Sequence, residues 1–142
     1  MADNLNNEEK ITVQAIGKSI KSSPRKANVT LSLIRGLRVD KAINNLEFCR
    51  KRISNEILKI LKSAISNAEN NHQLDIDKLV VKEASVGKSM VLKRFRPRAR
   101  GRAGKILKTF SRIRILVQEK SEDNKKKLNE NKKTKVDDGT KN

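Results

Sequence analysis

Residues 93–117 read KRFRPRARGRAGKILKTFSRIRILV, and this stretch decides the fold. From Lys93 to Arg114 the chain has ten basic residues and no acidic one. Five arginines occupy every second position here: Arg94, Arg96, Arg98, Arg100 and Arg102. In an extended chain this period of two places them on one side, about 6.8 Å apart, close to two phosphate steps along a nucleic-acid strand. The segment therefore predicts an extended structure that binds phosphates.

The end of the stretch predicts one arm of a long β-hairpin. Apolar residues occupy alternate positions there, at Ile113, Ile115 and Val117. We expect this arm, Lys93–Val117, to pair with an earlier extended segment, Leu79–Val91. The hairpin would then span about residues 79–117, with its turn near Gly87-Lys88-Ser89. A two-stranded ribbon is marginal in water, so we expect it to be ordered by the partner that it binds.

Three helices are predicted before the hairpin. Ser23 is a suitable N-cap and Pro24 fits the first helical position, so a first helix begins there and continues toward Gly36. Asp40 is expected to cap a second, short helix. A long third helix has one apolar stripe, formed by Ile53, Ile57, Ile60, Leu61, Ala64 and Ala68. A stripe of this length needs a sheet to pack against.

The composition points to a polyanion as the partner. The chain has 142 residues, 34 Lys plus Arg and a net charge of +18, which fits one domain with tails. It has three Phe and neither Trp nor Tyr, so few aromatic rings are expected for stacking on bases. One cysteine (Cys49) and one histidine (His72) leave disulfides, metal sites and histidine catalysis without partners. We therefore expect no enzyme activity, no metal and no cofactor.

The charge is concentrated between the two ends of the chain. Residues 1–10 are slightly acidic and residues 119–142 form a mixed Lys/Asn/Glu/Asp tract, and both are predicted to be disordered. Residues 11–118 hold 25 basic and 7 acidic residues and form the predicted domain. The apolar runs are too short to span a bilayer and the N-terminus resembles no export signal, so neither membrane association nor secretion is expected.

Four blocks of sequence carry a family resemblance. They are Ser23-Pro24-Arg25-Lys26-Ala27, Leu33-Ile34-Arg35-Gly36, residues 63–71 (SAISNAENN), and residues 97–103 (PRARGRA) followed by Ile106-Leu107-Lys108. In order and spacing they resemble the family of bacterial ribosomal protein twenty-two of the large subunit. The resemblance implies an α+β fold of three helices packed on a three-stranded antiparallel sheet, with a long protruding β-hairpin. It also implies a cytoplasmic location in the ribosome, where this hairpin lines the nascent-peptide exit tunnel.

The expected partners are large-subunit ribosomal RNA of the 23S type, neighbouring ribosomal proteins and, at the hairpin tip, the nascent peptide. No homo-oligomer is expected. The tip is predicted to comprise Lys88, Ser89, Met90, Val91, Leu92, Lys93, Arg94 and Phe95. The candidate RNA-binding residues are Lys18, Lys21, Arg25, Lys26, Lys93, Arg94, Arg96, Arg98, Arg100, Arg102, Lys105, Lys108, Arg112 and Arg114.

Two other functions compete with this hypothesis. Residues 24–48 could form a DNA-binding helix-turn-helix, with Gly36 in the turn and Arg35 and Arg38 near it. Its weakness is the second helix, which is rich in Asp, Asn and Glu and offers a groove little positive charge. The chain could also be an inert basic scaffold that only neutralises charge within an assembly.

Overall fold

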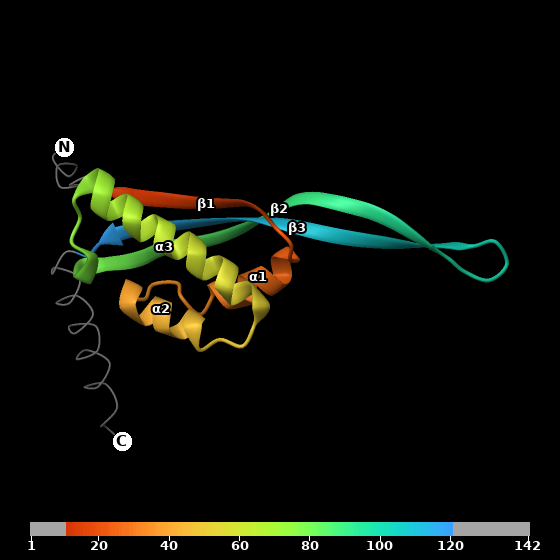
Figure 1. The fold of residues 1–142 in the computed structure, drawn as a ribbon, viewed down its shortest axis with the longest axis horizontal. Coiled ribbons are helices and arrows are strands. Elements are labelled where there is room, and N and C mark those ends of the chain that lie inside the picture. The colour runs from red at the N-terminus through yellow and green to blue at the C-terminus, as the bar shows by residue number, and fades with distance from the viewer. Residues whose placement is uncertain (1–10, 121–142) are drawn as a thin grey trace, which may run out of the picture.

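A computed structural model describes residues 11–120; the tail predicted at 1–10, and all but the first two residues of the tail predicted at 119–142, lie outside this range. The elements follow the order β1 (Thr12–Ile20), α1 (Pro24–Leu31), α2 (Val39–Glu47), α3 (Arg52–His72), the 3-10 helix η1 (Ile76–Lys78), β2 (Leu79–Pro97) and β3 (Ala103–Glu119). The sheet is antiparallel with the strand order β1-β3-β2, which confirms the predicted α+β class. Figure 1 shows the helices gathered along one part of the sheet, while β2 and β3 continue beyond them as a hairpin.

The first helix begins as predicted and the second does not. The Ser23 hydroxyl accepts a hydrogen bond from the Lys26 backbone N–H (3.4 Å), and Pro24 opens α1. Asp40 is not the N-cap of α2, because the helix begins at Val39 after Arg38, which makes no side-chain cap. Arg38 is extended and forms a β-bridge with Val80, so the helix can begin only directly after it.

The apolar stripe of α3 packs on the sheet and forms the centre of the core. Ile57, Leu61, Ala64 and Ala68 are fully buried, and Ile60 is partly buried at the edge of the stripe. The sheet supplies buried residues from β1 and from the last part of β3, namely Val13, Ala15, Ile113, Ile115 and Val117. Each large aliphatic side chain buried in this way stabilises the fold by about 1.5–3 kcal/mol. The third-helix prediction is confirmed in detail.

The sheet narrows from three strands to two at Ser111. β1 pairs with β3 as far as Ile20 opposite Ser111, whereas β2 continues alongside β3 up to Pro97 opposite Ala103. We call the two-stranded part beyond this point the ribbon: residues 88–97 and 103–111. Among the described residues, none between Ala84 and Ser111 is buried. The ribbon therefore projects from the body without a core of its own.

The predicted turn near Gly87-Lys88-Ser89 is wrong, because this segment lies within β2. Gly87 pairs with Arg112, and the irregularity nearby is a β-bulge between Lys88 and Val91. The chain reverses at residues 98–102 instead, where the Arg98 N–H donates to the Arg102 carbonyl oxygen (2.7 Å). Arg100 and Gly101 have φ values of 59° and 70°, so two consecutive left-handed residues make the turn. Residues 88–95, predicted as the tip, form the side of the ribbon.

Gly17 marks a close approach between α3 and β1. A Cβ atom at this position would lie 2.5 Å from Ile60 Cδ1 and 2.9 Å from Ile20 Cδ1. We therefore predict that Gly17→Val lowers the free energy of unfolding by about 1–3 kcal/mol through overpacking. Gly87→Val is the matched control, since Gly87 is also a strand glycine but has open space around its Cβ position. Urea unfolding of both variants is the measurement, and equal stability would contradict this account of the packing.

Candidate nucleic-acid interface

The sequence predicted that the five alternating arginines lie on one side of an extended strand, and this prediction is wrong. Arg94 and Arg96 belong to β2 and share a face, whereas Arg98, Arg100 and Arg102 lie in or beside the turn. The left-handed backbone at Arg100 breaks the alternation there. The arginines therefore spread around the end of the hairpin, where they can reach phosphates from several directions.

The strand register places basic and apolar side chains on both faces of the ribbon. Residues directly opposite each other in an antiparallel pair share a face. One face combines Lys93 with Leu107 and Phe95 with Lys105. The other combines the pairs Arg94–Ile106 and Leu92–Lys108. A hairpin that lay on one surface would separate the two kinds of side chain, so this ribbon is suited to contacts on both faces.

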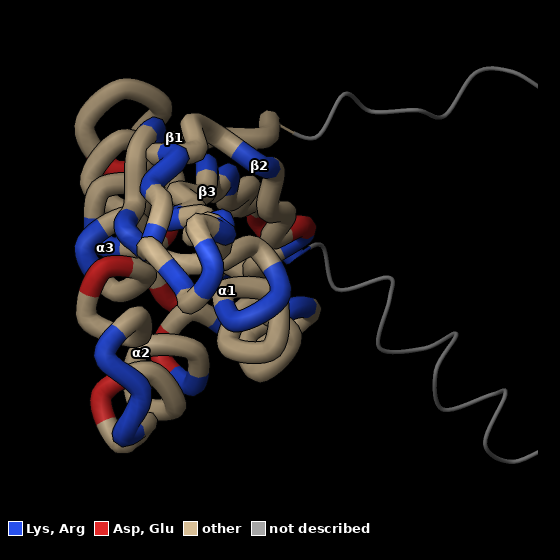
Figure 2. The backbone as a smooth tube through the Cα atoms, turned by 90° about the vertical axis from the view of Figure 1, so that its right-hand side faces the viewer, with Lys and Arg blue, Asp and Glu red and all other residues tan. Residues whose placement is uncertain are grey.

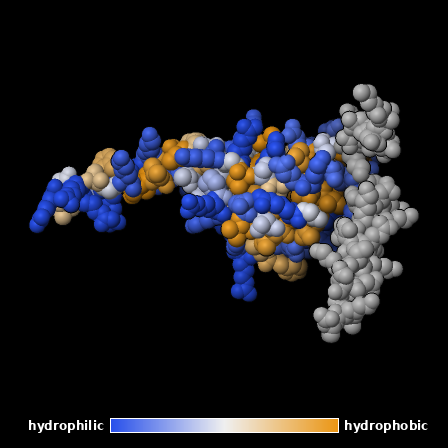
Figure 3. All heavy atoms as spheres, turned by 180° about the vertical axis from the view of Figure 1, so that it is seen from behind, coloured by the Kyte–Doolittle hydropathy of each residue, from blue (hydrophilic) through white to orange (hydrophobic). Residues whose placement is uncertain are grey.

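The apolar side chains of the ribbon are exposed to solvent. Phe95 is 77% exposed, Leu107 61% and Met90 48%. Figure 3 shows apolar surface interleaved with hydrophilic surface along the projecting hairpin, whose end is hydrophilic. These side chains lose the free energy of burial in the protein alone, and burial against another molecule would recover it.

Within the ribbon and up to Arg112, the sequence has basic residues and no acidic one. The sequence from residue 84 to residue 118 contains no Asp or Glu, and Lys105, Lys108 and Arg112 are all exposed. Arg114 differs, because its guanidinium lies 3.2 Å from a Glu83 carboxylate oxygen. The hydrogen bond from Arg114 lowers the pKa of Glu83. Arg114 is therefore the predicted contact whose charge is partly offset on the protein itself.

A second basic surface lies on the body where the hairpin leaves it. It contains the predicted residues Lys18, Lys21, Arg25 and Lys26 at the end of β1 and the start of α1. The connection between α2 and α3 adds Arg50 and Lys51, and the start of α3 adds Arg52; none of the three was among the predicted residues. Figure 1 shows both segments at the end of the body from which the hairpin extends, and Figure 2 shows their basic residues from that direction. We call these seven residues the shoulder.

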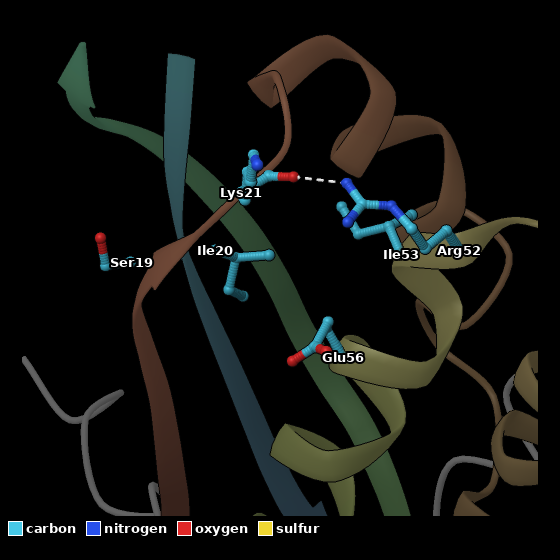
Figure 4. Close-up of a pocket in the computed structure, with 6 residues that line it drawn as sticks. All are labelled: Ser19, Ile20, Lys21, Arg52, Ile53 and Glu56. Atoms are coloured by element: carbon cyan, nitrogen blue, oxygen red, sulfur yellow. Dashed lines mark hydrogen bonds between the residues drawn. The ribbon is translucent and has the colours of Figure 1, made fainter. Parts of the chain in front are cut away.

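Hydrogen bonds and ion pairs shape the shoulder. The Arg52 guanidinium donates to the Lys21 carbonyl oxygen (2.8 Å), which ties the start of α3 to the end of β1 (Figure 4). The two nearest carboxylates in the chain face other lysines: Glu47 lies 4.0 Å from Lys62, and Glu56 lies 3.6 Å from Lys59. Three consecutive basic residues at the start of a long helix, the last of them its first residue, are the sequence signal for this part of the surface.

The helix-turn-helix alternative does not fit the structure. The Arg35 side chain donates to the Ala84 carbonyl oxygen (2.7 Å), and the Arg38 side chain donates to the Asp77 carbonyl oxygen (2.6 Å). Both arginines thus hold α1 and α2 to the sheet region instead of facing a DNA groove. On α2 itself, the Asn45 side chain donates to the Leu33 carbonyl oxygen.

Residues 11–120 contain no group of His, Cys, Asp and Glu side chains arranged to hold a metal ion. No helix within this range is long and apolar enough to cross a membrane. The Cys49 thiol is partly exposed, and a hydrogen bond with Ser54 lowers its pKa. In the described part of the chain, no hydrogen bond joins this thiol to a side chain that could act as a general base. The positively charged surfaces are therefore the features that suggest a function.

The fold and its surfaces define a small α+β protein built to contact a polyanion through a projecting hairpin. Comparison with known proteins names the family: the model of the ribosomal protein L22p/L17e family matches residues 15–118, and the chain belongs to this family. A relative from Maricaulis maris is 60% identical over 105 residues, covering 74% of this chain and 83% of the relative. A relative from Beijerinckia indica is 56% identical over 106 residues, covering 75% and 82%. Both relatives are named large ribosomal subunit protein uL22.

Family membership confirms several predictions. The chain is a structural component of the ribosome and not an enzyme, and its location is the cytoplasm as part of the ribosome. It also decides against the helix-turn-helix alternative, in agreement with the hydrogen bonds of Arg35 and Arg38.

The turn of the hairpin depends on Gly101, whose φ of 70° is strained for any residue with a side chain. We predict that Gly101→Ala destabilises the turn by about 1 kcal/mol and increases amide hydrogen exchange in the ribbon. The melting temperature of the body should remain unchanged, because the ribbon contributes no buried residue between Ala84 and Ser111. Gly104→Ala is the control, since a Cβ there meets only ordinary contacts 3.7 Å away. A lower melting temperature for Gly101→Ala would refute the independence of ribbon and body.

Proposed function

We propose that this protein is a structural constituent of the large ribosomal subunit and binds 23S-type ribosomal RNA with its ribbon and shoulder. The observation that carries the proposal is the distribution of side chains on the ribbon, where both faces combine basic and exposed apolar residues. Phosphates can pair with the basic side chains, and sugars and bases can cover the apolar ones. Such a ribbon is suited to insertion between RNA segments. The names of the relatives agree with this subunit.

The energetics of the isolated ribbon explain why it needs RNA on both sides. Two strands without a packed face are marginal in water. Basic side chains at diagonal positions of the two strands, such as Lys93 and Lys105, also repel each other, and no carboxylate between residues 84 and 118 offsets their charge. RNA that surrounds the ribbon would remove both penalties at once. We infer that the protein supports subunit assembly in this way, because RNA segments on opposite faces are held together by the same two strands.

The side of the ribbon formed by residues 88–95 is the part that we assign to the nascent-peptide exit tunnel. Residues 88–95 lie between the body and the turn, and they include the exposed Met90 and Phe95. A peptide passing a wall of anionic RNA would meet apolar protein surface at these positions. The body remains available for contacts with neighbouring large-subunit proteins, because Figure 1 shows it at the opposite end of the molecule from the turn.

RNA binding should depend strongly on salt. If about six phosphates are engaged, the logarithm of affinity for protein-free 23S-type RNA should fall against the logarithm of salt concentration with a slope near −5. Changing Arg98, Arg100 and Arg102 together to Gln should make this slope shallower by about 2–3. Without these arginines, fewer phosphates are neutralised and fewer counterions are released on binding. Filter binding at salt concentrations between about 50 and 200 mM measures the slopes of the wild type and of the triple variant. A wild-type slope shallower than about −2 would overturn the proposal.

Contact with the nascent peptide can be tested by cross-linking. The chain has a single cysteine, so Cys49→Ser provides a background for a new cysteine at Phe95. We expect Phe95→Cys in assembled subunits to cross-link to a stalled nascent chain. Leu33→Cys, on the body, should not cross-link and serves as the control. Equal cross-linking yields from the two positions would contradict the tunnel assignment, and the proposal of RNA binding would stand.

A further inference from the structure

Phe48 is the most exposed of the large apolar residues described, at 86%. Phenylalanine normally contributes about 1.5–3 kcal/mol to folding when it is buried, and at this position the protein forgoes most of that contribution. Its backbone is fixed nevertheless: Phe48 N–H donates to the Asn44 carbonyl oxygen at the end of α2 (3.1 Å). The ring is therefore presented to solvent from a rigid position.

The connection that carries Phe48 is also fixed and strongly basic. Arg50, Lys51 and Arg52 follow within four residues. The buried Ser54 side chain hydrogen-bonds to the carbonyl oxygens of Cys49 and Lys51, so it closes the connection against the first turn of α3. A platform that is ordered before binding loses little entropy when a ligand settles on it.

A hollow of about 440 Å³ lies beside this connection, between α1 and the start of α3. Its lining includes the two lysines Lys26 and Lys51 and the apolar Val29, and no carboxylate. The neighbouring hollow of about 220 Å³, drawn in Figure 4, includes Glu56 and is less suited to an anion. Phe48 and Lys51 are three residues apart, so their Cα atoms are separated by at most about 11 Å.

We propose that the α2–α3 connection forms a second RNA-binding element in which Phe48 stacks on an unpaired base. Lys26 and Lys51 hold the adjoining phosphate in the hollow. The proposal rests on the proposed function, because it takes ribosomal RNA as the ligand. Charge favours RNA over a protein partner: the element has three basic residues in sequence, and the nearest carboxylates, Glu47 and Glu56, face Lys62 and Lys59. An aromatic ring beside basic side chains is the usual arrangement for an unstacked base.

This element corrects one expectation from the composition. Three phenylalanines suggested that bases would find few rings, yet Phe48 and Phe95 are largely exposed and both lie among basic residues. Phe48 belongs to the shoulder side of the molecule and Phe95 to the ribbon. The two rings would therefore contact separate parts of the RNA.

The experiment uses the full-length protein and protein-free 23S-type RNA. Phe48→Leu keeps an apolar side chain and removes the ring, and we expect affinity to fall about five- to tenfold at unchanged salt slope. Phe48→Tyr should retain the affinity of the wild type. Lys26→Gln combined with Lys51→Gln should weaken binding and make the salt slope shallower by about 1–2. Leu33→Ala, at another exposed apolar residue of the body, is the control and should bind like the wild type.

A direct readout of stacking is available because the chain contains no tryptophan. The single indole of Phe48→Trp should be quenched and protected from acrylamide when RNA binds, whereas that of Leu33→Trp should not change. The proposal would be overturned if Phe48→Leu bound RNA like the wild type and the indole of Phe48→Trp were not quenched. RNA binding by the protein would still stand. Protection of the indole by ribosomal proteins alone would also overturn it, in favour of a protein partner. If the wild-type protein did not bind 23S-type RNA, the proposed function itself would be refuted.

Discussion

The packing of α3 across the sheet is the contact on which the rest of the structure depends. Its buried stripe covers the part of β3 that carries Ile113, Ile115 and Val117, and this part has a paired strand on each side. Because β3 is held in this way, its continuation beyond Ser111 leaves the body in a fixed direction. The body thus holds in place a ribbon that has no buried residue before Ser111, where it joins the body. The shoulder lies where body and ribbon meet, so RNA that surrounded the ribbon, as proposed, would also meet the basic residues of the body.

Charge and packing are divided between the two parts of the molecule. The body buries its apolar residues and pairs most of its carboxylates with nearby lysines or arginines. The ribbon does neither, since none of its apolar side chains is buried and its stretch of sequence contains no acidic residue. Stability measured on the isolated protein therefore reports on the body. Properties of the ribbon become measurable only through exchange, cross-linking or binding.

The sequence predicted the features that depend on local chemistry. The Ser23 cap follows from a hydroxyl next to Pro24, and the α3 stripe follows from helical spacing, so both were found. Asp40 was misjudged because a tertiary contact, the bridge from Arg38 to Val80, sets the start of α2. The turn was misplaced because glycine at position 87 suggested a reversal, whereas the chain reverses through a left-handed arginine at position 100. Arg50, Lys51 and Arg52 were missed as part of the surface, since only folding brings them next to the end of β1.

The ribbon also constrains how a protein of this shape can change in length. Each strand residue adds about 3.4 Å of reach, and each step turns the following side chain to the opposite face. An insertion in one strand alone would disrupt the ladder or require a further bulge, like the one between Lys88 and Val91. One residue added to both strands would lengthen the ribbon but exchange the faces of everything beyond it. Paired insertions of two residues per strand preserve every face, so the reach of the hairpin can vary without loss of register only in increments of about 7 Å.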